Sequence, residues 1–136
     1  MTATKTVPLR LFIARLGVTA TAEMVDRNPH MDGSDQMDNY RVLLRHGRKQ
    51  MTVYFSMGLA LGREPSAEDV LDCLASDASG VDNASSFEDW CGEYGYDTDS
   101  RKAERIFKVC ERQAAKLRNF LGQDDYEALL WHTERL

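Results

Sequence analysis

The chain has 136 residues, a length typical of one domain that buries a hydrophobic core without a metal ion or a disulfide bond. Apolar residues make up 43% and charged residues 29% of the sequence, as in ordinary soluble globular proteins. The net charge of −5 argues against a general nucleic-acid-binding protein, because such proteins usually carry an excess of basic residues.

The beginning of the chain predicts one strand behind a short tail. Residues 1–7 are small and polar, and we expect them to be flexible, with a single domain over 8–136. From Val18 onward the stretch VTATAEMV alternates loosely, which predicts a strand within 12–25. The residues expected on its apolar side are Val18, Ala20, Ala22 and Met24.

The clearest β-signal lies at 39–58, NYRVLLRHGRKQMTVYFSMG. Apolar and polar residues alternate on both sides of the polar turn HGRK, in which Gly47 can adopt a positive φ. A polar loop over 27–38 separates this hairpin from the first strand. Three antiparallel strands joined in chain order, a meander, are therefore the simplest arrangement.

Two helices are expected after the hairpin, each with its own start signal. Ser66 stands before two acidic residues in PSAED, so we expect it to cap a helix that ends at Gly80. Ser85 and Glu88 have the spacing of a capping box, which predicts a short helix to about Glu93.

The longest predicted helix runs over 99–121 and is amphipathic. One face carries apolar residues at three- and four-residue steps, namely Ala103, Ile106, Phe107, Cys110, Ala114, Leu117, Phe120 and Leu121. A last helix is expected to begin at Asp124. It carries the apolar residues Tyr126, Leu129 and Leu130. Strands followed by helices indicate an α+β fold, a three-stranded antiparallel sheet with about four helices packed on one face.

Charge is segregated along the chain, because every formal charge between Arg63 and Arg101 is negative. The acidic residues of this segment are Glu64, Glu68, Asp69, Asp72, Asp77, Asp82, Glu88, Asp89, Glu93, Asp97 and Asp99. Three interpretations stay open. The acids cap helices and are neutralised by the basic helix over 99–121, or they form a face that steers a basic partner to its surface, or they serve catalysis.

Aromatic residues accompany the acids in FEDWCGEYGYD, residues 87–97. Phe87 and Trp90 lie three residues apart on the short helix, so both can face the core. Tyr94 and Tyr96 flank a glycine, and their rings either cover the core or stand exposed as anchors for arginine side chains. The residues predicted to bind a partner are Glu88, Asp89, Glu93, Tyr94, Tyr96, Asp97 and Asp99.

The turn of the hairpin is basic. Arg45, Arg48 and Lys49 either grip a phosphate backbone, together with the basic side of the helix over 99–121, or keep the turn soluble and discourage edge pairing. A nucleic-acid-binding accessory factor that uses these residues is the alternative to an acidic protein-binding face. Nucleic acid is the less expected partner, because the net charge is negative.

No constellation of residues predicts catalysis, a metal ion or another cofactor, so we expect a protein that is not an enzyme. None of the three histidines lies at metal-ligand spacing from another histidine or a cysteine. The cysteines form no CxxC pair, and Cys73 and Cys110 fall in apolar helical patterns that predict buried thiols. Residues 26–38 have the composition of a calcium-binding loop but not its spacing. No segment resembles a signal peptide or a membrane helix.

Three stretches resemble small proteins encoded by bacteriophages and prophages: MTVYFSMG, EPSAEDVLDCLASDASG and SFEDWCGEYGYDTDSRKAERIFKVC. The segments MVDRNPHMDG and MDNYRVLLRHGRKQMTVYFS fit the same pattern, so the resemblance covers roughly residues 20–122. Its most specific pieces are PSAEDVL, FEDWCGEYGYD and DSRKAE. The resemblance carries over no catalytic residue.

The resemblance implies a biological setting for the protein, that of a bacteriophage protein acting inside a bacterial host cell. Small acidic phage proteins are often accessory proteins that act on host machinery, and anti-CRISPR proteins are one such group. These bind a nuclease or a surveillance complex, often by filling a basic nucleic-acid groove with an acidic face. The implied partner is therefore a host protein such as a CRISPR-Cas nuclease or surveillance complex. The implied location is the cytoplasm of a bacterial host cell, with the protein a monomer or a homodimer.

Overall fold

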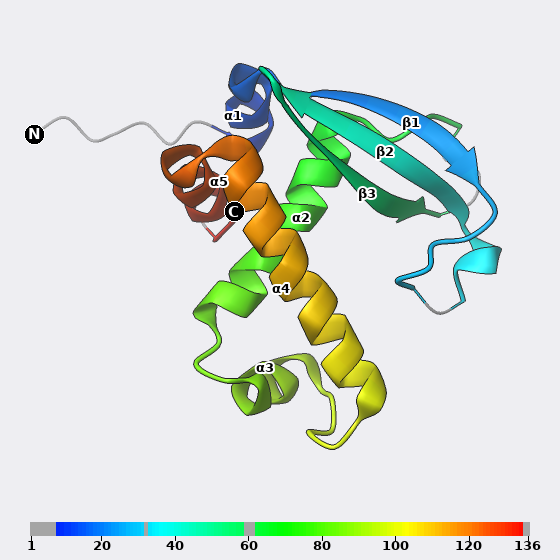
Figure 1. Ribbon diagram of the computed structural model, residues 1–136, viewed down its shortest axis with the longest axis vertical. Coiled ribbons are helices and arrows are strands. Elements are labelled where there is room, and N and C mark those ends of the chain that lie inside the picture. The colour runs from blue at the N-terminus through cyan, green and yellow to red at the C-terminus, as the bar shows by residue number, and fades with distance from the viewer. Residues whose placement is uncertain (1–7, 32, 59–61, 135–136) are drawn as a thin grey trace, which may run out of the picture.

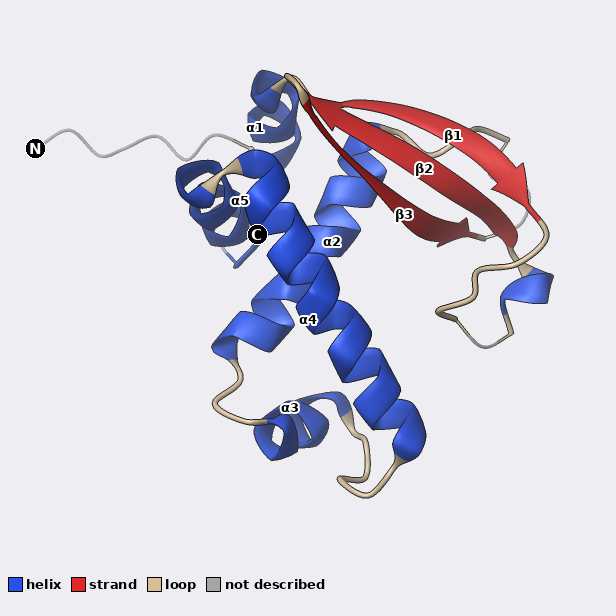
Figure 2. Cartoon of the chain, viewed as in Figure 1, coloured by secondary structure: helices blue, strands red, loops and turns tan. Residues whose placement is uncertain are grey.

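The computed structural model describes residues 8–31, 33–58 and 62–134, with side chains of the last helix described to residue 132. Its elements in chain order are α1 (Leu9–Leu16), β1 (Thr19–Val25), the short 3₁₀-helix η1 (Ser34–Gln36), β2 (Asp38–His46), β3 (Lys49–Met57), α2 (Ala67–Asn83), α3 (Phe87–Tyr94), α4 (Arg101–Leu121) and α5 (Gln123–Glu134). Figures 1 and 2 show the sheet on one side of the helices, which confirms the α+β class. The tail expected to be flexible, 1–7, lies outside the described residues.

The sheet is the predicted three-stranded antiparallel meander, in the order β1-β2-β3. Its register pairs Ala22 with Val42 and Val42 with Val53, so these side chains share one face. This face is buried beneath the helices. The hairpin turn consists of Gly47 and Arg48, and Gly47 adopts a φ of +61° as its position predicted.

A helix precedes the sheet, which the sequence did not indicate. The prediction of a strand within 12–25 is right only from Thr19 onward, because α1 occupies the preceding residues. Leu9 and Ile13, four residues apart, are the buried residues of α1, so this short helix presents one apolar stripe to the core. Met24, expected on the buried side, is 64% exposed, because β1 extends there beyond the helices (Figure 1).

Two of the predicted helix boundaries need correction. Ser66 caps α2 as predicted, in a capping box with Asp69, but Gly80 does not end the helix, which continues to its cap at Ala84. Ser86 and not Ser85 caps α3. In the described ranges, no helix is both long and apolar enough to cross a membrane.

Buried apolar residues form two separate clusters. The main core lies between the sheet and parts of α1, α2, α4 and α5, and it includes the predicted residues Tyr126, Leu129 and Leu130. A smaller cluster of Trp90, Cys91 and Ala103 holds α3 against the first half of α4. This smaller cluster positions the candidate site.

The burial of the cysteines only partly matches the prediction that Cys73 and Cys110 are buried. Cys91 is buried and Cys110 is partly buried, whereas Cys73 is exposed, because it lies beside the buried row of α2 rather than in it. Burial of the sulfur, and then the charge of Asp77, raise the pKa of Cys73 to about 11 even so. Burial raises the pKa of Cys110 to about 12. Neither thiol is ionised near neutral pH, so neither is a strong nucleophile.

The polar loop over 27–38 is used for internal hydrogen bonding. Asn28 and Ser34 are buried, and the backbone N–H of Asn28 donates to Oγ of Ser34 at 2.9 Å. The buried side chain of Asn39 donates to the carbonyl oxygen of Ser34 at 2.7 Å. The buried amides and the hydroxyl of this region therefore fix the connection of the loop to the sheet.

Candidate functional site

The residues predicted to bind a partner lie together where α3 forms one end of the molecule (Figure 1). Trp90 is 4% exposed and anchors α3. The rings that surround it have centroid distances of 5.1 Å for Phe107, 5.3 Å for Tyr94 and 5.4 Å for Tyr96. Phe87 is half-buried in the same cluster, so its predicted inward position is confirmed together with that of Trp90. The aromatic cluster fixes α3 from inside and leaves its acidic residues outside.

Asp89 has a structural task at the start of α3. Its backbone N–H donates to Oγ of Ser86 at 3.1 Å, and its carboxylate accepts the N–H of Ser85 at 3.2 Å. The predicted capping box of Ser85 and Glu88 is therefore not formed: Ser86 is the cap, and Asp89 rather than Glu88 reaches back, to the residue before that cap. Asp89 is a capping residue as well as a surface acid.

Tyr94 is the most exposed ring of this face, with 50% of its surface accessible. Its hydroxyl end rests on α2, where a Cβ atom added to Gly80 would lie 2.2 Å from Oη of Tyr94. The glycine expected to end α2 therefore makes room for a tyrosine along a continuing helix. Burial against α2, and then the charges of Asp77 and Glu93, raise the pKa of Tyr94. Its hydroxyl accordingly remains a hydrogen-bond donor at neutral pH.

Two hollows flank Tyr94. The larger, with a volume of about 430 Å³, lies between α2 and α3. Its polar lining consists of Ser76, Ser79, Asn83, Asp89 and Glu93. The smaller, with a volume of about 200 Å³, is lined by Asp77, Trp90, Tyr94, Tyr96, Ile106 and Cys110. Each hollow combines carboxylates with aromatic rings, a combination that suits an arginine guanidinium.

Tyr96 is oriented differently from Tyr94. It is half-buried, and its ring stacks on Trp90 with an angle of 5° between the planes. Tyr96 therefore belongs mainly to the aromatic cluster, whereas Tyr94 stands at the surface. The question that the sequence left open is answered differently for the two tyrosines.

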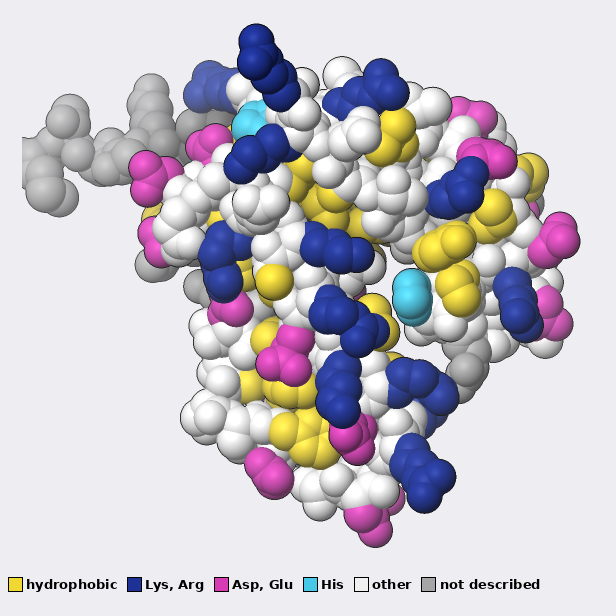
Figure 3. Space-filling view, in the orientation of Figure 1, with side chains coloured by type: hydrophobic (Ala, Val, Ile, Leu, Met, Phe, Trp, Pro, Cys, Tyr) yellow, Lys and Arg dark blue, Asp and Glu magenta, His cyan; other side chains and the backbone are white. Residues whose placement is uncertain are grey.

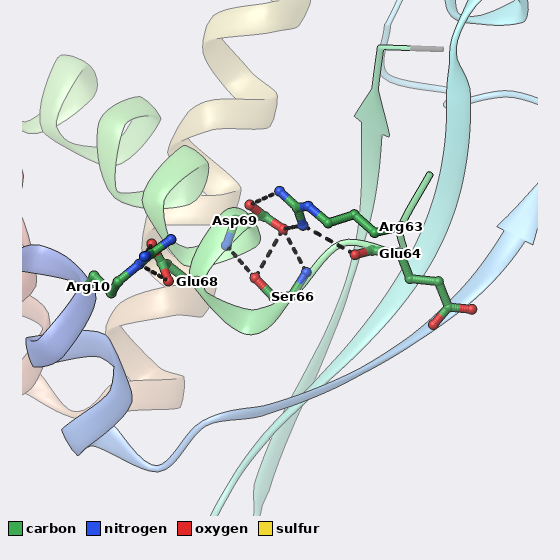
Figure 4. A network of polar contacts seen from close by, with 6 residues as sticks. All are labelled: Arg10, Arg63, Glu64, Ser66, Glu68 and Asp69. Carbon is green, nitrogen blue, oxygen red and sulfur yellow. Dashed lines mark hydrogen bonds and ion pairs between the residues drawn. The ribbon is translucent and has the colours of Figure 1, made fainter. Parts of the chain in front are cut away.

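At the N-terminus of α2 the acidic segment is neutralised by neighbouring bases (Figure 4). Glu68 pairs with Arg10 at 3.0 Å, and Asp69 pairs with Arg63 at 2.5 Å. Hydrogen bonding to Arg63, with further hydrogen bonds from Ser66, lowers the pKa of Asp69 to about 2. These acids serve the start of the helix.

At the other end of α2 the acidic segment meets α4. Asp82 accepts a hydrogen bond from the hydroxyl of Tyr126 at 2.7 Å and lies 3.6 Å from the guanidinium of Arg118. That guanidinium also lies 4.8 Å from the ring centroid of Tyr126. Internal neutralisation by the basic helix, one of the open interpretations, is therefore found at Asp82.

Around α3 the situation is different. Glu88, Glu93, Asp97 and Asp99 are all exposed, and no lysine, arginine or histidine among the described residues forms an ion pair with them. The acidic segment thus has paired carboxylates at the two ends of α2, at Glu68, Asp69 and Asp82, and a group of exposed carboxylates without ion pairs around α3. The group around α3 is the one that surrounds Tyr94.

The basic tip of the hairpin lies near the opposite end of α4 (Figure 1). Lys49 donates through Nζ to the backbone carbonyl oxygen of Asn119 at 2.6 Å, and Nδ1 of His46 lies 3.3 Å from the next carbonyl oxygen. Both contacts reach carbonyl groups that the end of a helix leaves without intrahelical partners. Lys49 is therefore engaged structurally, while Arg45 and Arg48 are exposed.

The histidines do not converge on a common site. His30 lies edge-on to Tyr54 at 5.7 Å, and His132 packs against Phe12 at 4.5 Å. Over residues 8–31, 33–58 and 62–132, no group of three or more histidine, cysteine or acidic side chains is placed to hold a metal ion.

Comparisons of the chain with protein-family models, with curated proteins and with solved structures gave no match. The site is therefore described by its geometry alone.

Two residues of the site were missed by the sequence analysis, Asp77 and Gly80 of α2. Asp77 was recognised as acidic, but nothing placed it beside Tyr94. Gly80 was interpreted as a helix end. Since the two are three residues apart, they lie on the same face of α2, and a glycine inside a helix with an acid one turn earlier was the available signal.

Proposed function

We propose that this protein is a bacteriophage-type accessory protein that binds a host protein and inhibits it by covering a basic nucleic-acid-binding surface. The acidic face that would bind consists of Glu88, Asp89, Glu93, Tyr94, Tyr96, Asp97 and Asp99. An anti-CRISPR protein that blocks a CRISPR-Cas nuclease or surveillance complex is the specific form of this proposal. The observation that carries it is the set of exposed carboxylates around Tyr94 that have no ion pair among the described residues.

Glu93 is the most informative of these carboxylates. It lies in the last turn of α3, where the helix dipole disfavours negative charge. Asp89 is a cap, and Asp97 and Asp99 lie just before the N-terminus of α4, where negative charge is favourable. A role in local structure thus accounts for Asp89, Asp97 and Asp99 but not for Glu93, and this difference supports a role for Glu93 in binding.

The mode of binding follows from the hollows beside Tyr94. An arginine side chain of the partner would enter the larger hollow, lie against the ring of Tyr94 and pair with Glu93. The surrounding acids would raise the rate of association with a basic surface, and this gain would fall as salt is added. Inhibition would be steric, because the occupied surface is the path of the nucleic acid.

The proposal is tested by retention of a partner from nuclease-treated bacterial lysate. The immobilised wild-type protein is compared with a Glu93→Lys/Asp97→Lys variant. The matched control is Asp35→Lys/Glu64→Lys, which changes the net charge equally at two exposed acids away from α3. We expect a nucleic-acid-binding protein to be retained by the wild type and the control and lost by the first variant.

The retained protein is then assayed for binding to its own nucleic acid. We expect added wild-type protein to abolish that binding and the Glu93→Lys/Asp97→Lys variant to leave it intact. Equal retention by all three forms would show that the partner binds elsewhere. A partner that holds its nucleic acid unchanged in the presence of the wild type would rule out inhibition by occlusion.

A further inference from the structure

The outer side of α4 carries a row of basic residues that the acidic face does not explain. The members of this basic row are Arg101, Arg105, Lys108, Arg112 and Lys116. They follow one another at steps of four, three, four and four residues, so they lie in a single line along the helix. All are exposed, and Figure 3 shows lysine and arginine side chains following α4 down the visible face.

The basic row faces away from the acidic segment. The buried residues of α4 that face α2 and the core include Ala103, Ala114 and Leu117, which lie on the opposite side of the helix from the row. Glu104 of the same helix pairs with Lys108 at 2.8 Å, and no acid among the described residues forms an ion pair with Arg101, Arg112 or Lys116. The positive charge of the row is therefore directed outward.

The spacing of the row disfavours the helix itself. Arg101 and Arg105, Lys108 and Arg112, and Arg112 and Lys116 are like charges four residues apart, an arrangement that destabilises a helix. An arrangement that weakens its own helix has no explanation in the packing of α4. It is explained if a polyanion neutralises the row.

The hairpin tip extends the row beyond the end of α4. Asn119, whose carbonyl oxygen accepts from Lys49, stands three residues after Lys116 and continues the same line. This hydrogen bond holds the turn at the end of the row. Arg48, which lies in this turn and is exposed, is thereby placed near the end of the row, whereas Arg45 alternates with the buried Leu44 and lies on the outer face of the sheet.

We propose that the basic row, with Arg48, binds the phosphate backbone of double-stranded nucleic acid without reading its sequence. From Arg101 to Lys116 the row spans about 22 Å at a rise of about 1.5 Å per residue. A straight line of cations of this length matches the regular charge of one duplex strand. The inference stands independently of the acidic face.

Two observations favour a duplex over other polyanions. The row consists of arginine and lysine alone, which bind phosphate irrespective of base sequence. The large apolar side chains that are exposed elsewhere, among them Tyr94 and Trp131, are not members of the row. The row therefore offers no aromatic platform for the bases of a single strand, whereas a duplex keeps its bases stacked internally.

The test is fluorescence anisotropy of a short labelled DNA duplex of arbitrary sequence, at NaCl concentrations between about 50 and 200 mM. The wild-type protein is compared with Arg112→Gln/Lys116→Gln. The control is Arg10→Gln/Arg27→Gln, which removes the same charge at two exposed positions outside the row. Thermal unfolding monitored by circular dichroism checks that each variant is folded.

We expect the wild type and the control to bind the duplex with the same salt dependence. In the row variant the slope of log K against log salt should fall by about 1.8, since each lost phosphate contact contributes about 0.9. A wild type that does not bind at the lowest salt, or a folded row variant that binds like the wild type, would overturn the proposal. Tighter binding of a single strand, or stronger competition by polyglutamate than by unlabelled duplex, would assign the row to another ligand and overturn it equally.

Discussion

The acidic face and the basic row are both charged surfaces, but their residues contribute differently to the stability of the fold. Asp69, Asp82 and Asp89 of the acidic segment cap helices or pair with bases, so much of its charge stabilises local structure. The arginines and lysines of the row repel one another along α4, and among them Lys108 forms an ion pair with Glu104 of the same helix. The comparison shows that the position of a charged residue relative to a helix end, more than the charge density around it, tells whether the residue stabilises the fold or is available to a partner.

The two surfaces also rest on different hydrophobic clusters. The acidic face depends on the small cluster around Trp90, whereas the second half of α4, which carries Arg112 and Lys116, belongs to the main core through Ala114 and Leu117. Each surface can therefore be disturbed while the other is kept.

The largest effect is expected from Trp90→Ala. Loss of a buried tryptophan typically lowers the free energy of unfolding by about 3–5 kcal/mol, through lost transfer energy and the cavity that remains. Because Trp90 contacts every other ring of its cluster, α3 should detach and binding to a basic partner should be lost. Urea unfolding measures the first effect and partner retention the second.

Phe87→Leu is the matched control for Trp90→Ala. Phe87 is only half-buried, and the replacement keeps most of its volume, so the loss should stay below about 1.5 kcal/mol. Duplex binding should survive both changes. If Trp90→Ala abolished duplex binding while most helical circular dichroism remained, the two surfaces would not be separable.

A medium effect is expected where the acidic segment meets α5. Tyr126 is 1% exposed, and its hydroxyl donates to the carboxylate of Asp82. Because hydrogen bonds to charged groups contribute about 1.5–3 kcal/mol, Tyr126→Phe should lower the free energy of unfolding by that amount. Tyr54→Phe is the control, because this partly buried ring packs on His30 by an edge contact that phenylalanine retains. Equal urea midpoints for Tyr126→Phe and the wild type would show that the hydrogen bond between Tyr126 of α5 and Asp82 of α2 does not stabilise the fold.

A smaller effect is expected at the cap of α2, where an acid is used structurally. Asp69→Asn should lower the free energy of unfolding by about 1 kcal/mol at neutral pH. The folded-state pKa of about 2 lies below the ordinary value of 3.8, so the charge of Asp69 stabilises the fold above pH 3.8 and this contribution is lost as pH falls towards 2. Urea unfolding between these pH values should therefore show a shallower pH dependence for Asp69→Asn than for Glu64→Gln. Parallel pH profiles for the two variants would contradict this role of Asp69.

The sequence predicted the parts of the fold that depend on local pattern. The alternation around HGRK predicted the hairpin, and Ser66 predicted the start of α2. The helix α1 was missed because LRLFIARL is short and offers only two buried positions, Leu9 and Ile13, too few for a clear period. Local pattern sufficed wherever neighbours in sequence decide the structure.

The candidate site could be predicted in composition but not in geometry. Its acids and tyrosines were identified, yet which carboxylates are paired depends on contacts with distant residues such as Arg118. The place of Tyr94 over Gly80 likewise depends on how α3 folds back onto α2. Such contacts between distant segments leave no periodic signal in a single sequence.

The smallest effect, and the one that separates the two surfaces most directly, is expected from Arg112→Gln. Arginine and glutamine have similar helix propensities, so the change mainly removes the repulsion of Arg112 by Lys108 and Lys116. At about 0.2–0.5 kcal/mol for each pair, the free energy of unfolding should rise by about 0.4–1 kcal/mol, and the gain should shrink at high salt. Lys108→Gln is the comparison, because it relieves repulsion but also breaks the pair with Glu104, so its stability should change less. A residue that weakens the fold and strengthens duplex binding is retained for binding, whereas a loss of stability in Arg112→Gln would show that the basic row, like Asp69, serves the structure.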